Sequence, residues 1–366
     1  MTRHCGLLIV GVALLLRPES VVAESAMASP PVKLPKINVP AYVPLRKVDD
    51  FHLRRGRACS AVVAYGDCLY IIAGEASSGE LLDSVEQFDI RTGRSREFAR
   101  LGTARFRHRA VLVGDKIYVL GGESRTLIQN PGDVARSAME APAEERMLAS
   151  DNLPGVELDD TVEIIDLKTG QVTAGPRMPD ARSNFGCVVV DQKIFVIGGK
   201  CLRGYSTART NRTEILELKV NKWKPGVPMP SPRQADAVIV DGPFIVVPGG
   251  FDGRQATSAV EAFNPRTGLW AVVPPLCSSI SSNASVFLGN YLFLFGDYDL
   301  PGEIMAYDLK TKRSETFTLG YRAARDAAAV VQNNRIWVVG GKTLADSEPT
   351  DLIQVFEPTK NKADAK

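Results

Sequence analysis

The amino-acid sequence predicts an all-β fold, a six-bladed β-propeller. Three observations predict it: an apolar hairpin recurs six times, its copies are spaced at a nearly fixed step, and each copy is followed by a second strand with its own turn. The hairpins close at residues 74, 122, 199, 250, 297 and 341, so the steps are 48, 77, 51, 47 and 44. A step of this size indicates repeated supersecondary units, and the step of 77 is one period plus an insertion.

The hairpin is clearest in the stretch KIYVLGG, Lys116–Gly122. The apolar run Ala110–Val113 precedes it, and Gly114-Asp115 supplies a two-residue turn between the two strands. The other five copies are DCLYIIAG (67–74), KIFVIGG (193–199), PFIVVPGG (243–250), YLFLFGD (291–297) and RIWVVGG (335–341).

A third strand follows each hairpin at a similar offset. Its alternation of apolar and polar residues marks a strand, and Arg/Lys-Thr-Gly marks the next turn. In units 3 and 4 a tryptophan follows (Trp223, Trp270) and leads into a Pro-rich fourth strand such as Val227–Pro230. Four short antiparallel strands in each of six units describe propeller blades. The copies are VEQFDIRTG (85–93), VEIIDLKTG (162–170), TEILELKVN (213–221), VEAFNPRTG (260–268), IMAYDLKTK (304–312) and IQVFEPTKN (353–361).

The double glycine, the V-E-x-F-D-x-x-T-G turn and the downstream tryptophan resemble kelch repeats. The resemblance covers about residues 43–360. It implies a kelch-type propeller, and it leaves function open because kelch propellers include both enzymes and binding scaffolds.

Residues 1–28 are expected to lie outside the fold. Arg3 begins a short basic start, Gly6–Leu16 is an apolar run, and Ala26-Met27-Ala28 fits a cleavage pattern. These features predict a secretory signal peptide cut after Ala28, with an uncleaved anchor as the alternative. We therefore expect a secreted or periplasmic protein.

Residues 29–42 are Pro-rich and predict an extended linker. Residues 44–51 are placed where an outer strand is expected, whereas the last unit leaves no room for its own fourth strand. The sequence therefore predicts that the N-terminal strand closes blade six and removes two sheet edges, with residues 361–366 as a tail. The insertion forms a long loop in blade 2, residues 124–160, with a short helix in Asp133–Leu148 broken at Pro142.

Charge and composition exclude several function classes. The net charge of +2 gives no bulk argument for nucleic acid or an anionic membrane. After residue 28 the chain has two histidines, His52 and His108, and no Cys-x-x-Cys motif, so no metal or cofactor is expected. A copper radical oxidase similar to galactose oxidase would need more histidines. The remaining five cysteines are an odd number, and Cys201 is the candidate for a reactive thiol.

Four arginines begin the first strands of their units at a fixed position. Each lies 17 residues before its closing glycine, whereas units 5 and 6 carry Ile280 and Ala324 there. A repeated arginine at a repeated position is expected to brace the scaffold, by capping loop carbonyls or pairing with a neighbouring blade's carboxylate. The four are Arg57, Arg105, Arg182 and Arg233.

Non-repeating residues near these arginines form the candidate site. In kelch proteins that bind ligands, two positions of each unit line the channel mouth: the one two residues after the repeated arginine and the one directly after the closing glycines. The resemblance implies the same here. The resulting mouth would be electropositive and would suit a carboxylate-bearing ligand or acidic peptide. The candidate ligand-binding residues are Arg107, His108, Asn184, Lys200, Arg325 and Lys342.

Two function classes remain open from the sequence. The first is a non-enzymatic, monomeric binding module for a protein or acidic glycan. The second is a sugar mutarotase similar to the six-bladed sialic-acid epimerases, in which Glu75 or Glu123 beside Arg107 would serve as acid and base. Asn211-Arg212-Thr213 and Asn283-Ala284-Ser285 both fit the glycosylation acceptor pattern.

Overall fold

The computed structural model describes residues 45–125, 156–203, 206–344 and 347–359. Their regular structure is antiparallel β-sheet, apart from a 3-10 turn at Ser77–Gly79. The expected signal peptide, linker, C-terminal tail and insertion helix lie outside the described residues and stay predictions.

Six sheets of four antiparallel strands form the blades. Blades 1 to 5 are meanders whose strands follow one another in chain order, whereas blade 6 joins three C-terminal strands to β1. Blade 1 holds β2 (Ala61–Tyr65), β3 (Cys68–Glu75), β4 (Leu81–Asp89) and β5 (Arg94–Arg100), and blade 2 holds β7 (Arg109–Val113), β8 (Lys116–Leu120), β11 (Val162–Asp166) and β12 (Val172–Ala174). Blade 3 holds β14 (Gly186–Val190), β15 (Lys193–Ile197), β18 (Thr213–Glu217) and β19 (Lys222–Pro225), and blade 4 holds β20 (Ile239–Asp241), β21 (Phe244–Pro248), β22 (Val260–Asn264) and β23 (Leu269–Val273).

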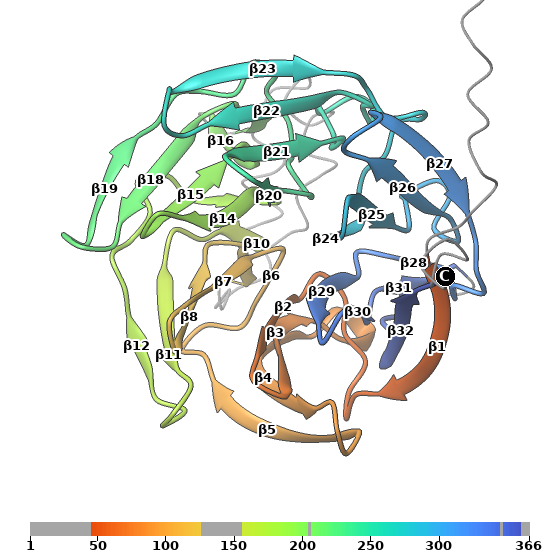
Figure 1. The fold of residues 1–366 in the computed structure, drawn as a ribbon. Coiled ribbons are helices and arrows are strands. Elements are labelled where there is room, and N and C mark those ends of the chain that lie inside the picture. Colours follow the sequence, from red (N-terminus) through yellow and green to blue (C-terminus); the bar gives the residue numbers. More distant parts are fainter. Residues whose placement is uncertain (1–44, 126–155, 204–205, 345–346, 360–366) are drawn as a thin grey trace, which may run out of the picture. The chain divides into compact units, whose positions relative to one another are not determined.

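Blade 5 holds β24 (Ala284–Leu288), β25 (Tyr291–Phe295), β26 (Ile304–Asp308) and β27 (Arg313–Phe317), and blade 6 holds β29 (Ala328–Gln332), β30 (Arg335–Val339), β32 (Leu352–Pro358) and β1 (Leu45–His52). The innermost strands contact one another in the order β2, β7, β14, β20, β24, β29 and back to β2. The blades therefore surround a common centre (Figure 1), and the expectation of an all-β propeller is confirmed.

The hydrophobic core is divided into layers between adjacent blades. Between blades 1 and 2, for example, Ile72 and Val85 pack with Ile117 and Val119, and all four side chains are fully buried. Similar clusters fill the other five gaps between adjacent blades. Because each sheet buries both faces in this way, the blades cannot separate without exposing apolar surface to water.

Strand β1 pairs along β32, with Leu45 opposite Pro358 and His52 opposite Leu352. Phe51 of β1 lies 5.5 Å from Phe88 and 6.0 Å from Trp337, measured between ring centroids. The N-terminal strand is thus the outer strand of blade 6, and it also packs against blade 1.

The fourth strand of blade 3 differs from the sequence expectation. It is β19, Lys222–Pro225, and Val227–Pro230 forms no strand. One further bond follows Pro225, from the Gly226 N–H to the Thr213 carbonyl at 2.8 Å, before the chain leaves the sheet. Trp223 belongs to this strand, and its indole donates to the Pro176 carbonyl at 2.9 Å.

Each of the four repeated arginines is buried against a glutamate of its own blade, so the expected alternative of a neighbouring blade's carboxylate is wrong. Each also donates to backbone carbonyls, which was the other expected alternative. The glutamate is the second residue of the V-E-x-F-D motif, or of its variant T-E-I-L-E in unit 3. This spacing puts it on the third strand beside the start of the first. The pairs are Arg57–Glu86 (3.0 Å), Arg105–Glu163 (2.6 Å), Arg182–Glu214 (3.0 Å) and Arg233–Glu261 (2.8 Å).

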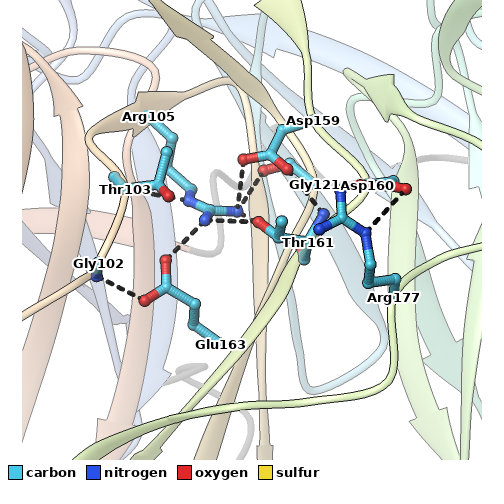
Figure 2. A network of polar contacts seen from close by, with 9 residues as sticks. All are labelled: Gly102, Thr103, Arg105, Gly121, Asp159, Asp160, Thr161, Glu163 and Arg177. Carbon is cyan, nitrogen blue, oxygen red and sulfur yellow. Dashed lines mark hydrogen bonds and ion pairs between the residues drawn. The ribbon is translucent and has the colours of Figure 1, made fainter.

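The pair in blade 2 shows how such an arginine is satisfied (Figure 2). Arg105 donates to the Gly121 carbonyl at 3.0 Å, to the Thr161 hydroxyl at 2.8 Å and to Glu163. The second oxygen of Glu163 accepts from the Gly102 N–H at 2.6 Å. Arg105 therefore connects the loop before its own strand, the closing glycine and the third strand.

Units 5 and 6 lack both members of the pair. In unit 5, Ile280 occupies the arginine position and Met305 the glutamate position. In unit 6, Ala324 and Gln354 occupy these two positions. The Gln354 side chain pairs instead with the backbone of Arg322, accepting at 2.7 Å and donating at 3.1 Å. An arginine or glutamate alone would leave a buried uncompensated charge, and this explains why the two are present or absent together.

We expect the blade 4 pair to show this coupling. Arg233→Ile should lower the free energy of unfolding by about 3–5 kcal/mol, because it leaves Glu261 buried and unpaired. Adding Glu261→Met reproduces the Ile280 and Met305 combination of blade 5 and should recover a large part of that loss. Denaturant unfolding of the two single variants and the double variant measures the coupling, and strictly additive losses would contradict it.

We also expect β1 to be required for blade 6. Deleting residues 1–51 should lower the melting temperature well below that of the full chain, because it exposes the β32 edge and the apolar faces around Trp337. Deleting only residues 1–40 leaves β1 intact and serves as the matched control. Differential scanning calorimetry compares the two truncations, and equal melting temperatures would rule out this role for β1.

Candidate functional site

The loops that follow the closing glycines gather at one end of the propeller, which we call the loop end. Short hairpins extend the blades there: β9 (Glu123–Arg125) with β10 (Val156–Leu158), and β16 (Lys200–Arg203) with β17 (Ser206–Arg209). These strands pair in turn with β6 (Arg105–Phe106) and β13 (Arg182–Ser183), and β28 (Ala324–Arg325) pairs with β31 (Lys342–Thr343). The candidate residues lie on or beside these pairs.

A ring of backbone hydrogen bonds surrounds the channel at the loop end. In five of the six blades the N–H two residues after the arginine position donates to the carbonyl at the same position of the preceding blade. Five of the six residues at this position have left-handed backbone, with φ from 51° to 56°, which turns the N–H and the carbonyl along the ring. The bonds are Cys59 to Asp326 (2.8 Å), Arg107 to Cys59 (2.9 Å), Asn184 to Arg107 (3.1 Å), Ala235 to Asn184 (3.0 Å) and Asp326 to Ser282 (2.9 Å).

The ring departs from this pattern at one junction, between blades 4 and 5. The Ser282 N–H donates to the side-chain carboxylate of Asp236 at 3.1 Å rather than to the Ala235 carbonyl. Asp236 stands next in sequence to Ala235, the ring residue without a left-handed φ. Its carboxylate completes the ring and points toward the channel centre.

Lys200 is buried beside Glu123 and does not face solvent. Its ammonium lies 2.8 Å from the Glu123 carboxylate, and both side chains are about 3% exposed. Ser183 donates to the same carboxylate at 2.6 Å, and Arg107 lies 3.4 Å from it. Burial alone would raise the pKa of Glu123, but Arg107, Lys200 and Ser183 outweigh it and hold the pKa below its ordinary value.

The other candidate cations also have neighbours. Lys342 lies 2.8 Å from the Glu75 carboxylate of the next blade. Arg325 stacks on the ring of Tyr298 with its guanidinium carbon 4.8 Å from the centroid, and Arg107 stacks in the same way on Phe106 at 5.0 Å. Two of the candidate cations are therefore neutralised pairwise by carboxylates, whereas Arg325 faces an aromatic ring.

His108 is fully buried rather than exposed at the mouth. Neither ring nitrogen has a hydrogen-bond partner of good geometry among the described residues, although the Ile72 backbone faces the ring. Burial first, and then Arg105 and Arg109, lower the pKa of His108 well below its ordinary range. The imidazole is therefore neutral and packs inside the propeller.

Exposed apolar side chains on the loop end were missed by the sequence reasoning, which searched for charges. They follow the closing glycines of blades 3, 5 and 6. Because the loops have no common pattern, the only signal was an apolar residue one to three positions after the closing residue of the hairpin. The side chains are Leu202 (59% exposed), Tyr298 (56%), Leu300 (53%) and Leu344 (65%).

The two possible glycosylation acceptors differ in the structure. Asn283 is only 6% exposed, which excludes a glycan on its amide in the folded protein. The amide of Asn211 donates to the Met229 carbonyl at 3.0 Å. Cys201, the candidate reactive thiol, lies on β16 with its pKa raised by burial, so it is less reactive than an open loop position would make it.

Neither a metal centre nor a membrane span is found in the described part of the chain. No three of its His, Cys, Asp and Glu side chains come together as metal ligands. No helix there is long and apolar enough to cross a membrane.

Comparison with known proteins agrees with this architecture. The model of the Kelch motif matches residues 56–102, 181–230 and 238–276, which fall in blades 1, 3 and 4. The chain is 28% identical to Kelch-like protein 40 of Xenopus tropicalis over 50% of its length and 31% of that protein. It is 24% identical to Kelch-like protein terF of Aspergillus terreus over 69% of its length and 64% of that protein.

Beta-scruin of Limulus polyphemus is a further similar protein, 22% identical over 68% of this chain and 26% of its own length. The chain thus spans about a third or less of most of these relatives and just under two thirds of Kelch-like protein terF.

The buried cluster around Glu123 leads to a pH-dependent prediction. Lys200→Met should lower the free energy of unfolding at about pH 7 by about 1–3 kcal/mol, because Glu123 loses one of its two cations. A carboxyl with a depressed folded pKa stabilises the fold above its ordinary pKa and stops doing so as pH falls. The difference between variant and wild type should therefore shrink at about pH 4.

Urea unfolding at the two pH values measures this difference. Lys222 is an exposed lysine of β19, and Lys222→Met is the matched control. It should change the free energy of unfolding little at either pH. A loss for Lys200→Met that is the same at both pH values would contradict the pairing with an ionised Glu123.

Proposed function

We propose that this chain, a kelch-repeat β-propeller, is an interaction module whose loop end binds an acidic, partly apolar segment of a partner protein. The kelch-like relatives support an interaction role in general, and the side chains of the loop end support the nature of the segment.

The stacked pair of Arg325 and Tyr298 carries the proposal. The Tyr298 side chain is 56% exposed, and the guanidinium lies across its ring. Arginine and tyrosine are the residues that most often dominate the free energy of protein interfaces. One Arg325 N–H donates to the Ser347 hydroxyl at 3.4 Å. Stacking uses the face of the guanidinium and not its edge, so the other N–H donors remain for a carboxylate.

Leu300 and Leu344 extend the same surface with apolar groups. Both belong to the loops of blades 5 and 6 and are more than half exposed. Exposed leucines beside an Arg and Tyr pair match the apolar centre and polar rim of protein interfaces better than they match a sugar site. This favours a peptide or protein surface over an acidic glycan.

The positive charge of the loop end is smaller than the sequence count indicated. Glu123 and Glu75 lie against Lys200 and Lys342, so those lysines contribute little net field. Of the candidate cations, Arg325 is therefore the one without an ion pair among the described residues. We infer that one or two carboxylates of the partner, rather than a polyanion, meet this surface.

The mutarotase alternative draws little support from the geometry. Glu75 or Glu123 would have to exchange protons with a sugar. The Glu123 carboxylate is buried and shared among Lys200, Arg107 and Ser183, and the Glu75 carboxylate lies 2.8 Å from the Lys342 ammonium. An acid with a depressed pKa that is closed off from solvent is a poor general acid near neutral pH.

We also propose that residues 1–28 direct export of the chain, on the sequence pattern alone. Intact-mass measurement of the protein recovered outside the expressing cells tests this. A mass that begins at Ser29 supports the proposal, and a mass that retains residues 1–28 contradicts it.

A peptide titration tests the binding proposal. The probe is a synthetic Glu-rich peptide that contains two leucines. Two control peptides are compared with it, one with Lys in place of Glu and one with Ser in place of Leu. We expect the acidic, leucine-containing peptide to bind best and to weaken between about 50 mM and about 300 mM NaCl. Preference for the Lys peptide, or no effect of removing the leucines, would contradict the proposal.

Variants assign the binding to the surface. Arg325→Ala and Tyr298→Ala should each weaken binding of the acidic peptide by about tenfold or more. Truncating a residue that anchors an interface costs at least about 1.4 kcal/mol of binding free energy. Arg266→Ala, in the exposed β22–β23 turn at the opposite end, is the matched control and should leave the affinity unchanged. An equal loss for all three variants would indicate unspecific charge attraction.

A further inference from the structure

The central channel contains a small polar cavity beneath the backbone ring. Its volume is about 150 Å³, and it is lined by the first residues of the inner strands from all six blades. Most of these residues are small, such as Ala61, Gly186, Ala284 and Ala328. The cavity is separate from the exposed loop surface to which the interaction role was assigned.

One inner-strand position departs from this pattern of small residues. At the place where blade 2 carries Arg109, the other five blades carry Ala61, Gly186, Ala237, Ala284 and Ala328. The Arg109 side chain therefore enters the channel, and it donates to the Asp236 carbonyl of blade 4 at 3.1 Å. It also donates to the His108 carbonyl at 3.3 Å, and its other N–H donors remain for the cavity.

Three polar atoms that line the same cavity have no hydrogen-bond partner among the described residues. They are the amide nitrogen and the amide oxygen of Asn283 and the hydroxyl of Ser60. Asn283 and Ser60 are each 6% exposed. Buried polar groups without partners carry a cost of about 1–3 kcal/mol each, so their retention together in one cavity indicates a polar occupant.

The remaining hydrogen-bonding capacity favours an acceptor. Arg109, the Asn283 amide and the Ser60 hydroxyl supply donors from three different blades. The Asp236 carboxylate is the main anionic acceptor, and it already accepts from the Ser282 N–H and lies 3.7 Å from Arg109. A planar carboxylate is the group that best matches a guanidinium together with neighbouring N–H and O–H donors.

We propose that the channel cavity binds a small monocarboxylate, held by Arg109, Asn283 and Ser60. The cavity is about half the lower limit of drug-sized pockets, roughly 300 Å³, which restricts the ligand to a few heavy atoms. The Arg109 side chain is 25% exposed, so solvent reaches the guanidinium and the site is accessible.

The bound carboxylate would compete with Asp236 for Arg109. The charged groups that face Asp236 are Arg109 and Arg107, which are cationic, and Asp326, which is anionic. Burial and Asp326 raise the pKa of Asp236 above its ordinary value, against the two arginines. A second anion raises it further, so the ligand should bind together with a proton and bind more tightly at lower pH.

Saturation-transfer NMR of the full chain with sodium acetate tests the proposal, with acetamide as the neutral molecule of the same shape. We expect saturable acetate binding and at least about tenfold weaker acetamide binding, because the charge-assisted hydrogen bonds are lost. Acetate should bind more tightly at about pH 6 than at about pH 7.5. Equal binding of acetamide, weaker acetate binding at the lower pH, or no saturable acetate binding would overturn the proposal.

Two variants assign the site, and both use residues that other blades already carry at the same position. Arg109→Ala should abolish acetate binding, and Asn283→Ala should weaken it by about tenfold or more. Arg325→Ala, on the loop end, should leave acetate binding unchanged while it weakens binding of the acidic peptide. Acetate binding that survives Arg109→Ala, or that is lost with Arg325→Ala, would overturn the assignment.

Thermal unfolding and a crystal structure with acetate provide measurements that do not depend on the variants. Acetate should raise the melting temperature of the wild type and not of Arg109→Ala, as a ligand specific for the folded state does. Density for an acetate between Arg109 and Asn283 would support the proposal. Density for ordered water only, at acetate concentrations that saturate the NMR signal, would refute it.

Discussion

The buried pair of arginine and glutamate is the interaction on which the first four blades depend. It joins the start of the inner strand to the third strand of the same sheet, as Arg105 and Glu163 do in blade 2. Because the guanidinium is buried, its remaining N–H groups donate to backbone carbonyls, such as that of Gly121 in blade 2, and this fixes where the loop end begins. Blades 5 and 6 reach the same geometry with Ile280 and Met305 or with Ala324 and Gln354. Removal of both charges is therefore compatible with the blade.

The ring of backbone hydrogen bonds depends on these fixed strand starts. It requires left-handed backbone at positions such as Cys59, Arg107 and Asp326, and side chains with Cβ occupy that region only when surrounding contacts hold them there. Cys59, Arg107 and Asn184 each follow a buried arginine by two residues, whereas Ser282 and Asp326 adopt the same backbone without one. Once the ring is formed, the loops outside it and the channel inside it become chemically separate surfaces. One carries Arg325 with exposed apolar groups, and the other carries Arg109 with Asn283.

This separation allows one scaffold to carry two kinds of recognition. The loops vary between blades and need only meet the ring at their ends, so Tyr298 and Leu344 can change without disturbing the core. The channel positions vary under tighter limits, because the five residues equivalent to Arg109 in the other blades are all Ala or Gly. A large side chain fits there only where its neighbours are small, and Arg109 meets that condition.

The sequence by itself determined the period, the blades and the positions of the repeated arginines, because local hairpin patterns recur at a fixed step. It also placed the strand at residues 44–51, which the structure has as Leu45–His52. It did not give the partners of the charges. Glu123 is close to Lys200 and Arg107 only because adjacent blades meet, and the sequence count of cations at the mouth omitted these carboxylates. Arg109, Asp236 and Asn283 come from blades 2, 4 and 5 and meet only at the channel. Tertiary structure decided both sites, because closing the ring brings together side chains that lie far apart in the chain.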